Sequence, residues 1–183
     1  MSIDRSQQRG ITLIEQIMFI VIVSVGVVAL VSAMYPMIRA SADPMRTKQL
    51  VAVAETVLGE ILHQPFTWCD PDDATASTAL SYADCANPQN TGTHGAGENR
   101  DGSGGMTPFD NVDDYGGFSM SNVTDAAGAN AVAGYDVAVA IVRAGTSFGL
   151  ADNEAALAIT VTVTAGSESF ALTGYRFRYA PRY

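Results

Sequence analysis

The longest apolar stretch of the chain lies near its N-terminus. Residues 16–38 contain no charged side chain and are rich in Ile, Val and Met. As an α-helix this stretch would extend about 34 Å, enough to cross a hydrocarbon layer of about 30 Å. Arg5 and Arg9 precede it, and positive charge ahead of a first apolar span favours a cytoplasmic N-terminus and an exported remainder. The pattern therefore predicts a membrane-spanning helix.

A second helical pattern follows the apolar stretch. Asp43 and Pro44 have the character of an N-cap followed by proline at the first helical position. Apolar residues then recur at spacings of three and four, and Pro65 ends the pattern. We therefore expect an amphipathic helix over residues 44–65. Pro36 should kink the apolar helix ahead of it, because proline lacks a backbone donor.

Residues 118–183 alternate between apolar and polar side chains. The alternation is clearest at 157–164 and recurs at 135–141, and this period of two predicts strands with one buried face each. Residues 118–120 are a candidate for one further short strand, and Ala165-Gly166 predicts a turn. One apolar face per strand predicts an antiparallel sheet packed on the amphipathic helix, which is an α+β fold.

The last predicted strand has an irregular pattern. The apolar positions in 170–172 and the aromatic positions in 175–179 fall on opposite parities, with Gly174 between them. An extra residue in one strand shifts the parity in this way. We therefore predict a β-bulge at Gly174, with arginines facing outward and these aromatic side chains facing the core: Tyr175, Phe177 and Tyr179.

Residues 66–117 show no periodic pattern. Glycines are concentrated between Gly92 and Gly117, so the sequence predicts a loop-rich region. This region holds the two cysteines of the chain, Cys69 and Cys85. An exported segment meets an oxidising compartment, which favours a disulfide between them. Two free thiols, or a metal site completed by histidines, are the alternatives.

Composition narrows the classes of partner. The chain has 183 residues, a net charge of -9 and a pI of about 4.4. Its length suits one globular domain. Because phosphate binding needs clustered cations, the acidic balance argues against nucleic acid as a partner. Arg176, Arg178 and Arg182 alternate with aromatic residues near the C-terminus, and we expect these arginines to meet acidic patches of a neighbouring subunit.

Glu15 is unusual because it lies inside the apolar stretch. A carboxylate in hydrocarbon is unfavourable by about 2.5–3.5 kcal/mol or more unless it is paired. Three interpretations compete. A secretory signal peptide would be cut after its apolar region, for which 31–33 is an acceptable site, and a plain membrane anchor would keep it. Neither of these two interpretations explains Glu15. A third interpretation has to supply a partner for its carboxylate.

The segment from Arg9 to Glu15, with the sequence RGITLIE, resembles the class III signal of type IV pilins and pseudopilins. The resemblance implies that a prepilin peptidase cuts after Gly10 and methylates the amine of Ile11. It also implies that Glu15 pairs with the methylated amine of a neighbouring subunit. Ile11 departs from the usual phenylalanine, which favours a minor subunit over a major pilin.

Two later stretches, 44–62 and 61–73, resemble the D-type minor pilin family of the mannose-sensitive haemagglutinin (MSHA) pilus. Together the resemblances and the patterns divide the chain into a leader at 1–10 and a transmembrane or assembly helix at 11–43. They place an amphipathic helix at 44–65, a loop-rich region at 66–117 and an antiparallel sheet at 118–183.

Two groups of oxygen-bearing side chains are weak candidates for calcium. One partly resembles an EF-hand loop and consists of Asn99, Asp101, Ser103 and Asp110, but Arg100 intrudes and no flanking helices are evident. The other consists of Asp70, Asp72 and Asp73. For both groups a solvated loop without metal is the alternative, and we expect no resident cofactor.

No catalytic motif is evident in the sequence, so we expect a structural protein rather than an enzyme. The expected function is that of a minor type IV pilin taking part in pilus assembly and adhesion. A type II secretion pseudopilin or a surface-binding pilin at a filament tip are alternatives. The resemblance implies other pilin subunits, prepilin peptidase, the assembly machinery and the bacterial inner membrane as partners, with a periplasmic C-terminal domain and a final location in the filament.

Overall fold

The computed structural model describes residues 10–179 and Arg182, without the side chains of residues 37–44. The chain falls into two compact units, Met1–Met45 and Arg46–Tyr183, which we call the N-terminal and the C-terminal unit. Helix α1 (Leu13–His63) begins in the first unit and ends in the second. The remaining elements all belong to the C-terminal unit.

Helix α1 joins the two predicted helices into one element. Helical backbone runs from Leu13 to His63 without a break, so the predicted helix start at Asp43-Pro44 is wrong. Proline has a fixed φ close to the helical value, so a helix can continue through it at the loss of one hydrogen bond. The kink expected at Pro36 stays a prediction.

The loop-rich region is as irregular as its composition predicts. It contains short 3₁₀ turns, with η1 at Tyr82–Asp84, η2 at Ser103–Gly105 and η3 at Asp113–Tyr115. Strands β1 (Glu98–Asn99) and β2 (Thr107–Pro108) pair in parallel over two residues each. Two further turns, η4 (Gly145–Phe148) and η5 (Asn153–Ala155), connect the strands described next.

The main sheet confirms the predicted α+β fold. Strands β3 (Ser119–Met120), β4 (Asp136–Arg143), β5 (Ala156–Ala165) and β6 (Glu168–Phe177) lie side by side in this order, each antiparallel to the next. Gly166 has a positive φ of 63° in the tight turn between β5 and β6, which confirms the predicted turn.

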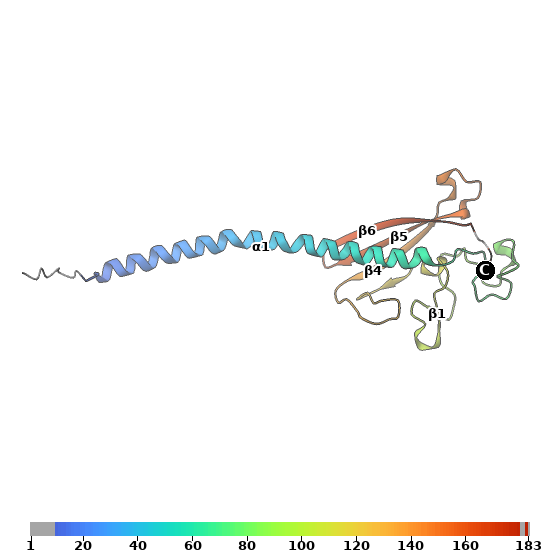
Figure 1. Cartoon of the computed structure of the whole chain (residues 1–183), viewed down its shortest axis with the longest axis horizontal. Coiled ribbons are helices and arrows are strands. Elements are labelled where there is room, and N and C mark those ends of the chain that lie inside the picture. The colour runs from blue at the N-terminus through green and yellow to red at the C-terminus, as the bar shows by residue number, and fades with distance from the viewer. Residues whose placement is uncertain (1–9, 180–181, 183) are drawn as a thin grey trace, which may run out of the picture. The chain divides into compact units, whose positions relative to one another are not determined.

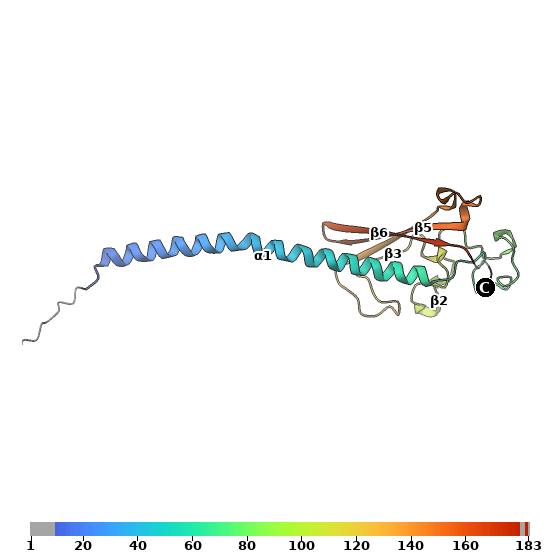
Figure 2. The same cartoon turned by 45° about the horizontal axis from the view of Figure 1, so that its top comes forward.

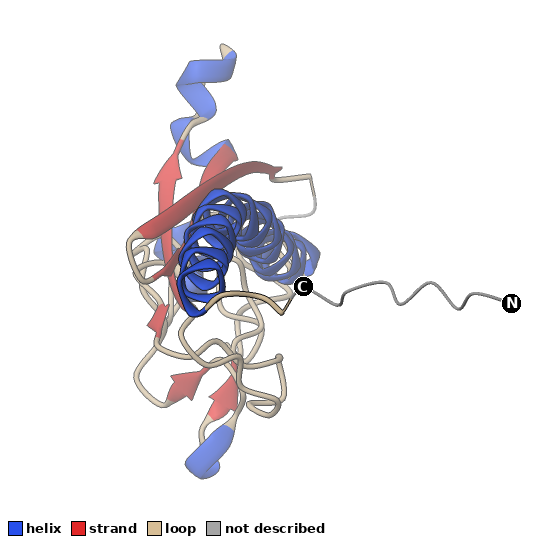
Figure 3. Cartoon of the chain, turned by 90° about the vertical axis from the view of Figure 1, so that its left-hand side faces the viewer, coloured by secondary structure: helices blue, strands red, loops and turns tan. Residues whose placement is uncertain are grey.

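The core of the C-terminal unit lies between the end of α1 and one face of the sheet (Figure 1; Figure 2). Figure 3 shows the same two layers, with the helix in blue and the strands in red. Alternate residues of β5 are fully buried, as the period of two predicts. The helix contributes Leu50, Ala54, Val57, Leu58 and Ile61, and the strands contribute Val137, Val139, Leu157, Ile159, Val161 and Val163.

Strand β6 corrects the predicted bulge. Its pairing with β5 runs without interruption from Glu168 to Phe177, so no extra residue is present at Gly174. Gly174 lies on the helix-facing side, where an added Cβ would approach the Leu58 side chain to 3.1 Å. The glycine therefore serves the close approach of the helix.

Phe170 and Leu172 pack on the core as predicted, but the faces of the chain after Gly174 are the reverse of those predicted, and Tyr179 is 80% exposed. Tyr175 is 51% and Phe177 is 43% exposed, and both contact the ring of Phe148 with centroids 5.0 Å apart. Arg176 is half-buried on the other side, and its Nη2 donates to the Gln64 carbonyl at 3.3 Å. The prediction was wrong because Gly174 occupies a packed position without an apolar side chain. The pattern of apolar residues therefore follows the exposed aromatic side chains instead.

The contact between Gly174 and Leu58 gives a testable consequence. Gly174→Val should destabilise the C-terminal unit by about 1–3 kcal/mol, because the new side chain overpacks against Leu58. Leu58→Ala alone removes a buried side chain and should also destabilise the unit, but the double variant should lose less than the sum of the two single losses. Urea unfolding of the full chain in detergent measures both effects. Additive losses, or a fully stable Gly174→Val variant, would contradict the packing described.

Candidate functional site

The first candidate site is the surface of α1 in the N-terminal unit. The segment Leu13–Pro36 is long and apolar enough to cross a membrane, and its apolar side chains are exposed on every side of the helix. A helix that is apolar all round needs lipid or other protein around it. The predicted apolar helix is therefore present as a candidate membrane span, and it suggests association with a membrane.

The predicted processing residues lie directly ahead of this helix. Gly10 and Ile11 are exposed and precede the first helical residue, Leu13. The hydroxyl of Thr12 accepts a hydrogen bond from the backbone N–H of Glu15 at 3.4 Å, which places Thr12 as the N-cap. The sequence analysis missed this cap, although Thr12 and Glu15 have capping-box spacing. Arg5 and Arg9 lie outside the described residues.

Glu15 occupies the first turn of α1 and is exposed. A carboxylate there interacts favourably with the positive end of the helix dipole. Among the described residues, no salt bridge to its carboxylate is formed. Its side chain is thus available for a partner outside this chain.

The predicted disulfide is present. Cys69 and Cys85 are bonded, with their Cα atoms 5.2 Å apart, so neither sulfur is available as a thiolate metal ligand. The two histidines are engaged elsewhere, His63 with the Gly59 carbonyl and His94 with the ring of Phe109. The zinc alternative therefore has no support in this arrangement.

A second candidate site lies within the loop-rich region. Five carboxylates, those of Asp70, Asp72, Glu98, Asp110 and Asp114, form what we call the acidic cluster. One oxygen each of Asp70, Glu98 and Asp114 lies within 4.8 Å of the other two, and the same holds for Asp70, Asp72 and Asp110. Asp70 is common to both groups, so the two groups adjoin through its carboxylate.

The acidic cluster is buried to different depths. Asp114 is 0% and Asp70 is 2% exposed, Glu98 and Asp110 are half-buried, and Asp72 is exposed. The backbone N–H groups of Asp110 and Asn111 donate to Oδ2 of Asp114 at 3.2 and 2.8 Å. The other oxygen of Asp114 and Oδ1 of Asp110 are buried without a hydrogen-bond partner.

Burial and neighbouring carboxylates raise the pKa values of three members of the acidic cluster. Burial, together with the neighbouring carboxyl of Asp70, raises the pKa of Glu98 to about 7. Burial and the charges of Asp70, Asp114 and Asp72 raise the pKa of Asp110 to about 7. Burial also raises the pKa of Asp114 to about 6, against the lowering effect of its two backbone donors. Among the described residues, no salt bridge brings a positive charge to these groups.

The structure divides the predicted calcium residues differently. Asp101 accepts from the Ser103 N–H and Asn99 donates to the Ser103 carbonyl, so this set forms a local turn. Asp110 belongs instead to the acidic cluster.

The second predicted calcium group is also divided. Asp70 and Asp72 join Asp110 in the acidic cluster. Asp73 accepts backbone bonds from Thr75, Ala86 and Asn87, which lower its pKa to about 2. Asp73 therefore has a structural role as a carboxylate that holds neighbouring turns.

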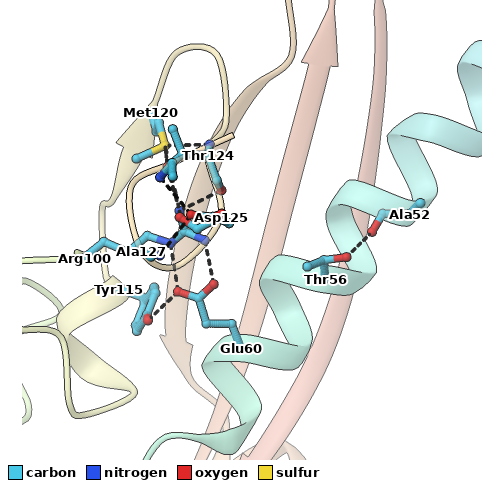
Figure 4. Close-up of polar contacts among 10 residues, drawn as sticks. Ala52, Thr56, Glu60, Arg100, Tyr115, Met120, Thr124, Asp125 and Ala127 are labelled. Carbon is cyan, nitrogen blue, oxygen red and sulfur yellow. Dashed lines mark hydrogen bonds and ion pairs between the residues drawn. The ribbon is translucent and has the colours of Figure 1, made fainter. Parts of the chain in front are cut away.

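A buried ion pair links α1 to the loops. The guanidinium of Arg100 donates to both oxygens of Glu60, at 2.8 and 2.6 Å, and the Tyr115 hydroxyl donates to Glu60 at 2.8 Å (Figure 4). Arg100 also donates to the carbonyls of Thr124 and Asp125. The sequence analysis treated Arg100 only as an intruder in a loop, because a single charged residue gives no periodic signal.

The arginines near the C-terminus do not form a free basic surface. The side chain of Arg178 is 4% exposed and lies over the rings of Trp68, Phe66 and Tyr82, at 3.9, 4.4 and 4.9 Å from their centroids. It also donates to the Glu154 carbonyl at 2.7 Å. The expectation that this arginine faces outward is therefore wrong, since its cation–π contacts hold it inside the unit.

Comparisons with known proteins give no family assignment: no family model, no curated protein and no solved structure matches the chain. The apolar N-terminal helix, the antiparallel sheet and the disulfide are compatible with a pilin-like fold.

The buried pair Glu60–Arg100 gives a prediction with an internal control. Arg100→Ala should destabilise the C-terminal unit by about 3–5 kcal/mol, because it leaves the Glu60 carboxylate buried and uncompensated. Arg46→Ala removes an ion pair that is 3.7 Å long and 53% exposed on the arginine side, and should change stability by less than about 1 kcal/mol. Urea unfolding of both variants tests the contrast, and equal losses would argue against it.

Proposed function

We propose that this chain is a minor subunit of the type IV pilin class, of the MSHA D type, that acts by assembling into a filament. The observation that carries the proposal is the junction of the RGITLIE segment with an exposed apolar helix. Such a subunit is made as a prepilin, held in the bacterial inner membrane with its C-terminal unit in the periplasm, and later packed into a pilus that takes part in adhesion. In this role the chain catalyses no reaction.

Processing is the first step of the proposed function. Prepilin peptidase cuts after Gly10 and methylates the new amine at Ile11. Exposure of both residues ahead of the helix start supports this step, because a protease needs an extended, accessible segment. The following helix keeps the substrate in the membrane during the cut.

Assembly is the second step. The apolar helix leaves lipid and packs among the helices of neighbouring subunits, where the hydrophobic gain is small because both surroundings are apolar. A polar interaction then has to fix the position of each subunit. Glu15 pairs with the methylated amine of Ile11 on an adjacent subunit and so sets the register of packing.

A role as a type II secretion pseudopilin is the alternative, because the same N-terminal segment serves both kinds of filament. A tip position with a surface-binding role is a further alternative. Immunogold labelling of sheared pili separates a tip position from a shaft position. The same labelling in secretion-deficient strains separates a secretion role from a pilus role.

Processing gives the most direct test. Gly10→Val should block cleavage, since a pocket built for glycine excludes a branched side chain, and the precursor should accumulate in the inner membrane. Mass spectrometry of the mature N-terminus measures the outcome, with wild type beginning at methylated Ile11. A wild-type chain that begins at Met34 would show instead that the apolar helix is a secretory signal peptide.

Glu15 tests the assembly step separately. Glu15→Ala should still be inserted and cut, but it should be depleted from filaments, because the partner amine stays uncompensated in a low dielectric. Glu15→Gln has a side chain that is able to accept a capping-box hydrogen bond but carries no charge, and it should be depleted as well. Glu55→Ala, at an exposed position of the same helix, is the control and should assemble normally.

The measurement is quantitative immunoblotting of membranes and of sheared filaments from the same cells. Normal incorporation of Glu15→Ala would contradict the pairing role. Incorporation restored by glutamine alone would assign Glu15 to the helix cap rather than to a partner's charge.

A further inference from the structure

We propose that the acidic cluster, formed by Asp70, Asp72, Glu98, Asp110 and Asp114, binds a calcium ion. The site is distinct from the EF-hand-like stretch at 99–110, from which it takes only Asp110. It lies wholly within the C-terminal unit, so the proposal does not depend on the processing or assembly of the chain.

The spacing of the oxygens suits a calcium ion. Calcium binds oxygen ligands at about 2.3–2.6 Å, so two ligands on opposite sides of the ion are about 5 Å apart and all other pairs are closer. In the acidic cluster, the oxygens of Asp70, Glu98 and Asp114 lie within 4.8 Å of one another. The second group, completed by Asp72 and Asp110, shares the carboxylate of Asp70 and meets the same limit.

Asp114 supplies an independent indication that a ligand belongs there. Its side chain is completely buried, and its Oδ2 is fixed by two backbone N–H groups, whereas its Oδ1 has no hydrogen-bond partner. A buried carboxylate oxygen without a partner is strongly unfavourable. The backbone donors therefore hold this carboxylate toward Asp70 and Glu98 at an energetic disadvantage that a bound cation would remove.

Four arginines of the described residues are paired with other acids. In the described part of the chain, Arg143 pairs with Asp113, Arg100 with Glu60 and Arg178 with Asp152. The remaining salt bridge joins Arg46 to Glu168. None of these bridges reaches the acidic cluster, so neutralisation of its carboxylates requires protons or a cation from solution.

The donor set favours calcium over other metal ions. All the available ligand atoms are carboxylate oxygens, which suit hard cations, and no histidine or thiolate is among them. The ligands come from a region with little regular secondary structure, which can adapt to the six to eight oxygens of a calcium shell. Magnesium retains several waters and binds through one or two carboxylates, so a site of five carboxylates suits it poorly.

A bound ion would join three separate parts of the loop-rich region. Asp70 and Asp72 lie at the start of the disulfide loop, Glu98 lies in β1, Asp110 precedes η3, and Asp114 belongs to it. These parts have little regular secondary structure between them. Calcium would therefore act together with the disulfide as a cross-link of this region.

The test uses the full-length chain in detergent, freed of metal with EGTA and titrated with calcium chloride. At a concentration about a hundred times Kd, the melting temperature of the C-terminal unit should rise by roughly 5–10 °C. Magnesium chloride at the same concentration should give a smaller rise. Isothermal titration calorimetry on the same sample gives the affinity directly.

Two variants and one control locate the ion. Glu98→Gln and Asp114→Asn each remove a carboxylate of the acidic cluster while keeping the size of the side chain, and should weaken calcium binding by about tenfold or more. Asp101→Asn changes an acid of the EF-hand-like stretch that lies outside the acidic cluster, and should leave binding unchanged. Two variants are used so that a folding defect in one leaves the other to decide the result.

Three outcomes would overturn the proposal. The first is a wild-type melting temperature that does not respond to calcium at several millimolar. The second is an equal response in wild type and in Glu98→Gln. The third is a response lost in Asp101→Asn but kept in Glu98→Gln, which would place the ion in the stretch at 99–110.

Discussion

The close packing of the end of α1 on one face of the sheet is the constraint on which the rest of the C-terminal unit depends. Leu58 lies against the backbone of β6 because Gly174 has no side chain there. This contact keeps β6 in uninterrupted register with β5 and turns Arg176 toward the helix. Two residues further along the same helix, on its opposite side, Glu60 holds Arg100 of the loop-rich region. The helix thus organises both the sheet and the loops.

Charged side chains around this core are arranged in two opposite ways. Glu60 and Arg100, and likewise Asp113 and Arg143, are paired where water is largely excluded, so each charge meets its opposite. In the acidic cluster, like charges face one another instead, and Asp114 is held in place by backbone donors. An arrangement of this kind is unfavourable for stability alone, which is why it indicates a ligand.

Local and periodic features could be predicted from the sequence. The apolar helix, the alternation in β4 and β5, and the Cys69–Cys85 disulfide were all foreseen, because each depends on neighbouring residues or on the compartment. Which side chains of β6 face the core was not predicted correctly, because a glycine at a packed position gives the same sequence pattern as a glycine in a turn or a bulge. The acidic cluster was foreseen only in fragments. Asp70, Asp72 and Asp110 were assigned to two different sites, and Glu98 and Asp114 to none, because the chain fold alone brings them together.

The burial of Arg178 has a consequence for the order in which the protein folds. This residue stands near the end of the chain, yet it completes the packing of Phe66, Trp68 and Tyr82, and it hydrogen-bonds to Tyr82 across 96 positions. A chain that crosses a membrane with its N-terminal helix anchored exposes residues 66–82 first and Arg178 among the last. If the C-terminal unit is exported as proposed above, residues 66–82 stay incompletely packed until Arg178 has also crossed, and such non-local contacts make folding slow. The native packing around Phe66, Trp68 and Tyr82 is therefore complete only once residue 178 is in place.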